Sequence, residues 1–149
     1  MLKNIIEPKL IFVKPDDTIV DASKLMAKED VGCVLVVKDK KPVGILTDRD
    51  IVLRCMAEHK DAGACKAEDI MTKSVICVYD TDGLYDCVEK MKEAKARRLP
   101  VIDKSGYALG IVSFGDILSV LSKEFYDLTS AVTAHEELEK KELEKKAAA

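Results

Sequence analysis

The chain has 149 residues, of which 48% are hydrophobic, 34% charged and 5% aromatic, with no tryptophan. This length fits one compact domain or two small halves that share a core, and the apolar content excludes disordered and fibrous proteins. The formal net charge of -3 gives no reason to expect binding to nucleic acid through overall charge. Any recognition of phosphate therefore has to be local.

Neither the first ten residues nor the aliphatic runs look like a targeting or membrane segment. The first ten residues lack a seven-residue apolar stretch and a small-residue cleavage site, and the aliphatic runs have only the length of strands. The five cysteines form no C-x-x-C pair, and an odd number argues against a disulfide framework. We expect a cytoplasmic protein that does not span a membrane.

An internal repeat organises the chain. An offset of 65 residues aligns Ile5 with Ile70, Ile11 with Ile76, Val13 with Val78, Asp17 with Asp82, Asp21 with Asp86, Met26 with Met91 and Val36 with Val101. After one extra residue in the second copy, Gly44, Ile45, Asp50 and Ile51 align with Gly110, Ile111, Asp116 and Ile117. The chain is therefore predicted to be a tandem duplication.

Both copies have the same order of predicted elements. The first copy has a strand at 10–13, a helix that begins at the Thr18–Asp21 capping box and ends near Asp30, a strand at 33–37, a turn at 39–42, a strand at 43–46, and a helix that begins at Thr47. The second copy has strands at 75–78, 99–102 and 109–112 and helices that begin near Asp82 and Ser113. Each β-α-β-β-α unit of about 60 residues buries too little surface to be stable by itself. We predict a mixed α/β fold in which the two units pack as a pseudo-twofold pair.

The remaining segments are a linker and an extended last helix. Residues 58–69 are polar and predict a linker. Leu121, Phe125, Leu128 and Val132 keep a 4-3-4 spacing, which predicts an apolar stripe that a partner copy could cover. From Glu136 onward, Glu and Lys form i,i+4 pairs, which fit either a solvated helix end or a short coiled-coil seam. Residues 147–149 are given no role.

A chemical motif closes each copy. Its pattern is glycine, two aliphatic residues, a hydroxyl residue, two further residues and aspartate, ending in Thr47 and Asp50 in the first copy and in Ser113 and Asp116 in the second. A hydroxyl and a carboxylate at a helix start lie beside unpaired amide groups that favour an anion. The aspartate could accept hydrogen bonds from ribose hydroxyls, but both pairs could equally be capping boxes without a ligand. Both interpretations remain open at this point.

This two-copy pattern resembles a pair of CBS domains, also called a Bateman module. The resemblance covers residues 5–125, and it is carried by 31–37 and 44–51 in the first copy and by 69–72 and 97–103 in the second. The corresponding division is a first motif at 1–60, a linker at 61–69, a second motif at 70–125 and a helical tail at 126–149.

The resemblance implies a regulatory module, not an enzyme. Such modules bind AMP, ADP, ATP or S-adenosylmethionine in two clefts and pair into homodimers, and a regulated partner protein is expected. By the resemblance, Asp50 and Asp116 would take the ribose hydroxyls, Thr47 and Ser113 would contact ribose or phosphate, and Arg49 would supply positive charge to one cleft only, because Gly115 is its counterpart. Adenine and phosphate would be lined by Lys9, Leu10, Val31, Gly32, Ser74, Val75, Arg97, Arg98 and Pro100.

Other functions are also compatible with the sequence. A scaffold dimer with degenerate clefts would have the same fold. Cys55, His59 and Cys65 could form a zinc or redox site, although a fourth ligand is missing. An enzyme would need a nucleophile paired with a base, and the two histidines, His59 and His135, lie in the predicted linker and in the charged tail.

Overall fold

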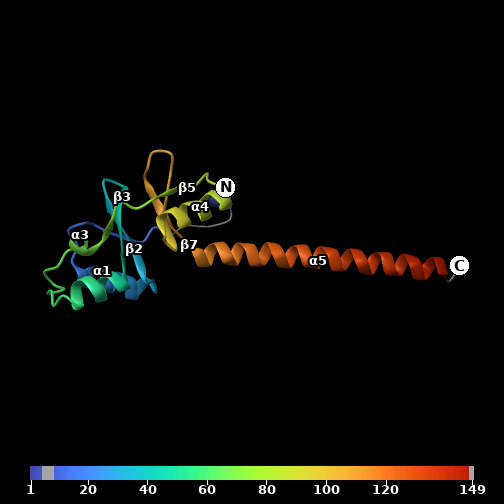
Figure 1. The fold of residues 1–149 in the computed structure, drawn as a ribbon, viewed down its shortest axis with the longest axis horizontal. Coiled ribbons are helices and arrows are strands. Elements are labelled where there is room, and N and C mark those ends of the chain that lie inside the picture. Colours follow the sequence, from blue (N-terminus) through green and yellow to red (C-terminus); the bar gives the residue numbers. More distant parts are fainter. Residues whose placement is uncertain (5–8, 148–149) are drawn as a thin grey trace. The chain divides into compact units, whose positions relative to one another are not determined.

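The fold is described from a computed structural model, which describes residues 1–4 and 9–147 (Figure 1). The repeat position Ile5 lies outside the described residues. In chain order the elements are η1 (Leu2–Asn4), β1 (Phe12–Val13), α1 (Ile19–Glu29), β2 (Cys33–Lys38), β3 (Lys41–Thr47), α2 (Asp48–Asp50), η2 (Ile51–Met56), α3 (Ala67–Ile70), β4 (Thr72–Lys73), β5 (Val78–Tyr79), α4 (Leu84–Ala94), β6 (Arg98–Ile102), β7 (Ala108–Ser113) and α5 (Phe114–Ala147).

The duplication is visible in the two sheets. The first sheet has the order β1-β2-β3-β4 and the second the order β5-β6-β7. In each, a short first strand runs parallel to the second strand, which pairs antiparallel with the third. The pairing register shifts at Val36/Val37 in the first sheet and at the repeat-equivalent Val101/Ile102 in the second. The mixed α/β architecture and its doubling are therefore confirmed.

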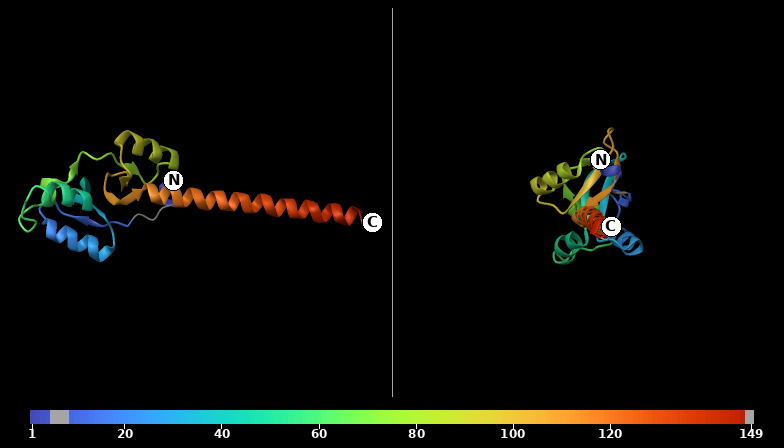
Figure 2. Two further views of the ribbon diagram at one scale, coloured as in Figure 1. Left: turned by 60° about the horizontal axis from the view of Figure 1, so that its bottom comes forward. Right: turned by 90° about the vertical axis from the view of Figure 1, so that its right-hand side faces the viewer.

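One face of the first sheet packs against helices. Thr18 caps α1 by accepting a hydrogen bond from the Asp21 amide, and the predicted face of Ile19, Ala22 and Met26 is buried. These residues share a core with alternate residues of β2, with Cys55 of η2 and with Ile70 of α3. Figure 2 shows α1 and η2 as neighbours beside the first sheet. The helix predicted after Thr47 continues as a π-helical segment, in which the Ala57 amide donates to the carbonyl of Val52.

The other face of the first sheet packs against the second sheet. Cys33, Leu35 and Val37 of β2 and Ile45 of β3 form a buried cluster with Ala108 of β7. At the tip of the β2–β3 hairpin, the Lys40 carbonyl accepts a hydrogen bond of 2.8 Å from the Ala108 amide. The pairing of the two copies therefore rests on apolar side chains of both sheets.

The segment predicted as a linker contributes to the first copy in its second half. Cys65, Ala67 and Ile70 are buried in the first core, and residues 67–70 form α3. Thr72 and Lys73 then pair with β3 as β4, so the first residues after the linker belong to the sheet of the first copy. The sequence pattern did not predict β4, because its pairing partners, Ile45 and Gly44, lie far along the chain.

The structure divides into two units, residues 1–113 and residues 114–149. The first unit contains both sheets, and the second contains the long helix α5, of which residues to 147 are described. No helix in the described part of the chain combines the length and the apolar composition needed to cross a membrane.

Gly44 is required by the close approach of β3 and β4. A Cβ built on Gly44 would lie 2.8 Å from the carbonyl oxygen of Thr72. Gly44→Val should lower the free energy of unfolding by about 1–3 kcal/mol, because backbone atoms have to move. Urea denaturation measures this change, and Gly63→Ala in the exposed linker is the control, expected within about 0.5 kcal/mol of the wild type. Equal stabilities of the two variants would contradict the tight β3–β4 contact.

The buried thiol of Cys33 should make the free energy of unfolding depend on pH in the alkaline range. Burial between the sheets raises the pKa of its thiol from 9.0 to about 11. Between these values the unfolded chain releases the proton and the folded chain retains it, so the free energy of unfolding should fall as pH rises from 9 to 11, by roughly 2–3 kcal/mol from this group. Urea denaturation across this range should show a steeper decrease for the wild type than for Cys33→Ala. Parallel pH profiles would contradict the assignment.

Candidate ligand-binding site

The end of β3 and the start of α2 form a reciprocal hydrogen-bonded turn. The Asp50 amide donates to Thr47 Oγ1 at 3.1 Å, and Asp50 Oδ2 accepts from the Thr47 amide at 3.0 Å and from the Thr47 hydroxyl at 2.8 Å. The two residues therefore form a capping box with aspartate in the place of the usual glutamate. The side chain of Asp50 is only 12% exposed, so its position is well defined.

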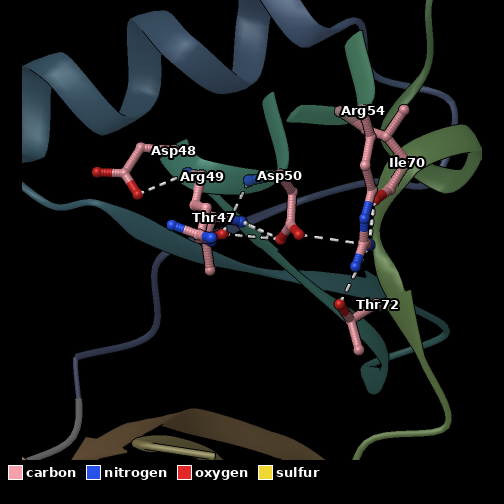
Figure 3. Close-up of polar contacts among 7 residues, drawn as sticks. All are labelled: Thr47, Asp48, Arg49, Asp50, Arg54, Ile70 and Thr72. Atoms are coloured by element: carbon pink, nitrogen blue, oxygen red, sulfur yellow. Dashed lines mark hydrogen bonds and ion pairs between the residues drawn. The ribbon is translucent and has the colours of Figure 1, made fainter. Parts of the chain in front are cut away.

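Arg54 forms an ion pair with the other carboxylate oxygen of Asp50. Its Nη1 atom lies 3.3 Å from Asp50 Oδ1, one helical turn earlier. The same nitrogen donates to the Ile70 carbonyl at 2.8 Å and to the Thr72 hydroxyl at 3.3 Å. Figure 3 shows Arg54 between Asp50 on one side and Ile70 and Thr72 on the other. Arg54 thus links the end of the first motif to the strand β4 that leads into the second.

The side chain of Asp48 has different hydrogen-bond partners and a different orientation from that of Asp50, although only one residue separates them. Its Oδ1 accepts from the Arg49 amide at 2.7 Å, and its own amide donates to the Gly32 carbonyl at 3.1 Å. A Cβ built on Gly32 would lie 2.8 Å from Asp48 Oδ2. The glycine therefore leaves room for Asp48, which is exposed and points away from Asp50 in Figure 3.

A cavity of about 410 Å³ lies beside Asp50, and we call it the Asp50 cavity. Both copies contribute to it. Its walls are formed by Ile45, Thr47, Asp50, Thr72, Lys73, Ser74, Val75, Ile76, Ala94, Ala96, Arg97, Arg98 and Leu99. The structure thus brings together six residues that the sequence assigned to the ligand: Thr47, Asp50, Ser74, Val75, Arg97 and Arg98.

The charges in the Asp50 cavity are divided between the copies. Asp50 comes from the first copy and Lys73 from strand β4 of the same sheet, whereas Arg97 and Arg98 come from the second copy. Aliphatic side chains make up most of the remaining wall. A partly apolar cavity with one carboxylate and three cations suits an uncharged ring that carries both hydroxyl groups and an anionic group.

The other predicted residues lie outside the Asp50 cavity. Arg49 is exposed, and Pro100 is buried in β6 opposite Ile111. Val31 packs against the first core, with Gly32 next to it beside Asp48. Lys9 forms an ion pair with Glu29.

Three further predicted residues are also absent from its walls. Leu10 lines a separate cavity of about 690 Å³ beside the tip of the β2–β3 hairpin. Ser113 is the last residue of β7, and Asp116 lies in the first turn of α5.

The sequence did not single out Lys73 and Arg54. Arg54 follows Asp50 by four residues, which is the spacing of a helical ion pair, so a local signal was present for that contact. Lys73 had no such signal, because its place in the wall of the Asp50 cavity depends on the pairing of β4 with β3.

The proposed cysteine and histidine site gains no support. Cys55 and Cys65 are buried in the first core, whereas His59 is exposed. Burial raises the pKa of the Cys65 thiol, and the neighbouring Cys55 raises it further, so Cys65 stays protonated at neutral pH. Within residues 1–4 and 9–147, no group of three or more His, Cys, Asp or Glu side chains is arranged to hold a metal ion.

The Arg54 contacts give a stability prediction. Arg54→Met should lower the free energy of unfolding by about 1–2 kcal/mol, because the Ile70 carbonyl and Asp50 lose a partner, with half-exposure of the side chain limiting the loss. Urea denaturation tests this, and Arg49→Met in the preceding turn is the matched control, expected to change little. A double-mutant cycle with Thr72→Val should show coupling between residues 54 and 72. Strict additivity would contradict a link through Arg54.

A family model for the CBS domain matches residues 2–57 and 67–123 of the chain. The CBS domain-containing protein YhcV of Bacillus subtilis is 33% identical over 116 residues, which is 78% of this chain and 81% of that protein. A Methanopyrus kandleri protein is 36% identical over 107 residues, but these are 71% of this chain and only 55% of that longer relative.

Solved structures agree with this match. The CBS domain protein PAE2072 from Pyrobaculum aerophilum, complexed with AMP, is 27% identical with a TM-score of 0.70 over 82% of this chain and 98% of that one. The CBS domain pair of protein MJ0100, in complex with 5-methylthioadenosine and S-adenosyl-L-methionine, is 26% identical with a TM-score of 0.73 over 83% of this chain and 97% of that one. The chain therefore belongs to the CBS-domain family and carries a tandem pair of these domains.

Proposed function

We propose that this CBS pair is a regulatory sensor that binds an adenosine-containing ligand in the Asp50 cavity. The observation that carries the proposal is the set of charges in the wall of that cavity, which holds one carboxylate, Asp50, and three cations, Lys73, Arg97 and Arg98. A nucleotide has the matching parts, because its ribose donates hydrogen bonds and its phosphate is anionic. No catalytic step is proposed.

The hydrogen bonds of Asp50 limit how a ribose can bind. Oδ2 already accepts two hydrogen bonds from Thr47, and Oδ1 forms an ion pair with Arg54. Since each carboxylate oxygen can accept about two hydrogen bonds, Oδ1 retains room for one ribose hydroxyl. A second hydroxyl could bind Oδ2 if the Thr47 hydroxyl turned away. In this pose the adenine lies against Ile45 and the aliphatic wall, and the phosphate faces the two arginines.

The related structures support the ligand class. PAE2072 is complexed with AMP, and the MJ0100 pair holds 5-methylthioadenosine and S-adenosyl-L-methionine. All three molecules contain adenine linked to a ribose ring with free 2' and 3' hydroxyl groups. The sequence repeat makes Ser113 and Asp116 the counterparts of Thr47 and Asp50, and we propose the same ribose role for them. A cytoplasmic location and a regulated partner protein belong to the same proposal.

One observation favours a second candidate function, a protein scaffold whose clefts are degenerate. Both oxygens of Asp50 are already bonded within the chain, so the turn is complete without a ligand. In this alternative the Thr47–Asp50 pair only caps the helix. Titration with adenosine-containing ligands distinguishes the two functions.

Isothermal titration of the wild type with AMP, ATP and S-adenosylmethionine tests the proposal. We expect at least one of them to bind with a Kd on the order of 1–100 μM, which corresponds to about 5.5–8 kcal/mol. Asp50→Asn should weaken binding at this site at least tenfold, because a charged acceptor is lost. Asp48→Asn is the matched control, since this exposed carboxylate is not part of the cavity wall, and it should bind as the wild type does.

The phosphate contact is tested by comparing AMP with adenosine. In the Arg97→Gln/Arg98→Gln double variant, AMP should lose its advantage over adenosine, whereas Asp50→Asn should weaken both. Absence of binding by all three ligands, AMP, ATP and S-adenosylmethionine, would favour the scaffold. Equal affinity of the wild type and Asp50→Asn would refute the ribose assignment.

A further inference from the structure

The long helix α5 carries a regular apolar seam. Phe114, Leu118, Leu121, Phe125, Leu128 and Val132 follow one another at spacings of 4, 3, 4, 3 and 4 residues. This is the seven-residue repeat of a coiled coil, in which the a and d positions face a partner helix. Leu118, Phe125 and Val132 occupy a, and Phe114, Leu121 and Leu128 occupy d. The seam ends where the next d position is His135 and the next a position is Glu139.

The seam is uncovered in the described chain. Its six side chains range from 46% exposed at Leu118 to 70% at Phe125, and every described residue from Leu121 onward is exposed. Figure 1 shows α5 as one continuous helix. Among residues 114–147 of α5 only Ile117 is buried, and helices that bury no apolar face are marginally stable in water, so an uncovered apolar stripe of this length is unfavourable. The match to the CBS domain ends at residue 123, so half of the seam lies beyond that domain.

We propose that this seam pairs with the same seam of a second copy, as a parallel two-stranded coiled coil. The flanking e and g positions favour self-pairing, because they are mostly small or uncharged, namely Gly115, Ser122 and Thr129 at e and Ile117, Glu124 and Ala131 at g. The other charged residues of this segment, Asp116, Lys123 and Asp127, occupy the outer c and f positions. In a parallel in-register pair, Glu124 lies across from Thr129 of the second copy, so no like charges meet. The inference does not depend on the nucleotide proposal.

The mass of the full-length protein in solution tests the pairing. Light scattering after size exclusion, at about 100 μM chain, should give at least twice the monomer mass of 16.5 kDa. Leu121→Asp/Leu128→Asp places charges in the seam and should halve the observed mass. Tyr126→Asp is the matched control, because Tyr126 lies on the same helix, is 70% exposed and occupies the outer b position, and this variant should keep the wild-type mass.

Three outcomes of the mass measurement would overturn the pairing of the seams. A monomeric wild type would overturn the proposal, as would a seam variant that keeps the wild-type mass or a control that loses mass as the seam variant does. Hydrogen exchange of the backbone amides of residues 1–113 should be the same in all three proteins, which separates loss of pairing from loss of folding.

Cross-linking tests the parallel register. Leu128→Cys should give a disulfide-linked dimer on mild copper-catalysed oxidation by air, because equivalent d positions meet in a parallel pair. Tyr126→Cys and the wild type should not, and four of the five native cysteines are buried. Failure of Leu128→Cys to cross-link while the dimer mass persists would overturn the parallel arrangement.

Discussion

The contact between the apolar faces of the two sheets is the interaction on which the rest of the structure depends. Strand β2 is buried on both sides, since Val34 and Val36 face the helices of their own copy and Leu35 and Val37 lie in the cluster shared with β7. A unit of about 60 residues buries only about 60% of its chain surface, which leaves little margin for stability. The shared cluster provides each copy with the second buried face that it lacks alone. It also places β3, which ends in the Thr47–Asp50 turn, next to residues of the second copy.

The Asp50 carboxylate has a structural role whether or not a ligand binds. It closes the capping box with Thr47, and through Arg54 it is connected to Ile70 and Thr72. A ligand that engaged Asp50 Oδ1 would compete for, or share, the oxygen that Arg54 contacts. By thermodynamic linkage, if a ligand weakened or strengthened the contact between Arg54 and Asp50, that contact would change the affinity for the ligand by the same factor. Arg54 is thus the residue through which occupancy of the Asp50 cavity could reach the connection between the copies.

The two copies share the order and direction of their first three strands but differ in the chemistry of their side chains. Arg97 and Arg98 in the wall of the Asp50 cavity correspond by the repeat to Gly32 and Cys33, which carry no charge. Gly32 instead provides space for Asp48, and Cys33 is buried between the sheets with a raised pKa. A phosphate at the counterpart of the Asp50 cavity would lack these two cations. This difference in charge supports unequal affinities for the two proposed sites.

The sequence alone determined the features that depend on neighbours within a few residues or on the repeat itself. These include the duplicated β-α-β-β-α order, the cap of α1 at Thr18, the buried face of Ile19, Ala22 and Met26, and the Thr47–Asp50 turn. Only the tertiary structure decided the existence of strand β4, the burial of Cys65 and Ala67, and the place of Lys73 in the wall of the Asp50 cavity. Their partners lie far along the chain, and a segment of two or four residues has too short a pattern to indicate which distant strand or core it joins. Asp50 comes from the first copy and Arg97 and Arg98 come from the second, so only the packing of the two sheets brings this carboxylate and these two cations into one cavity.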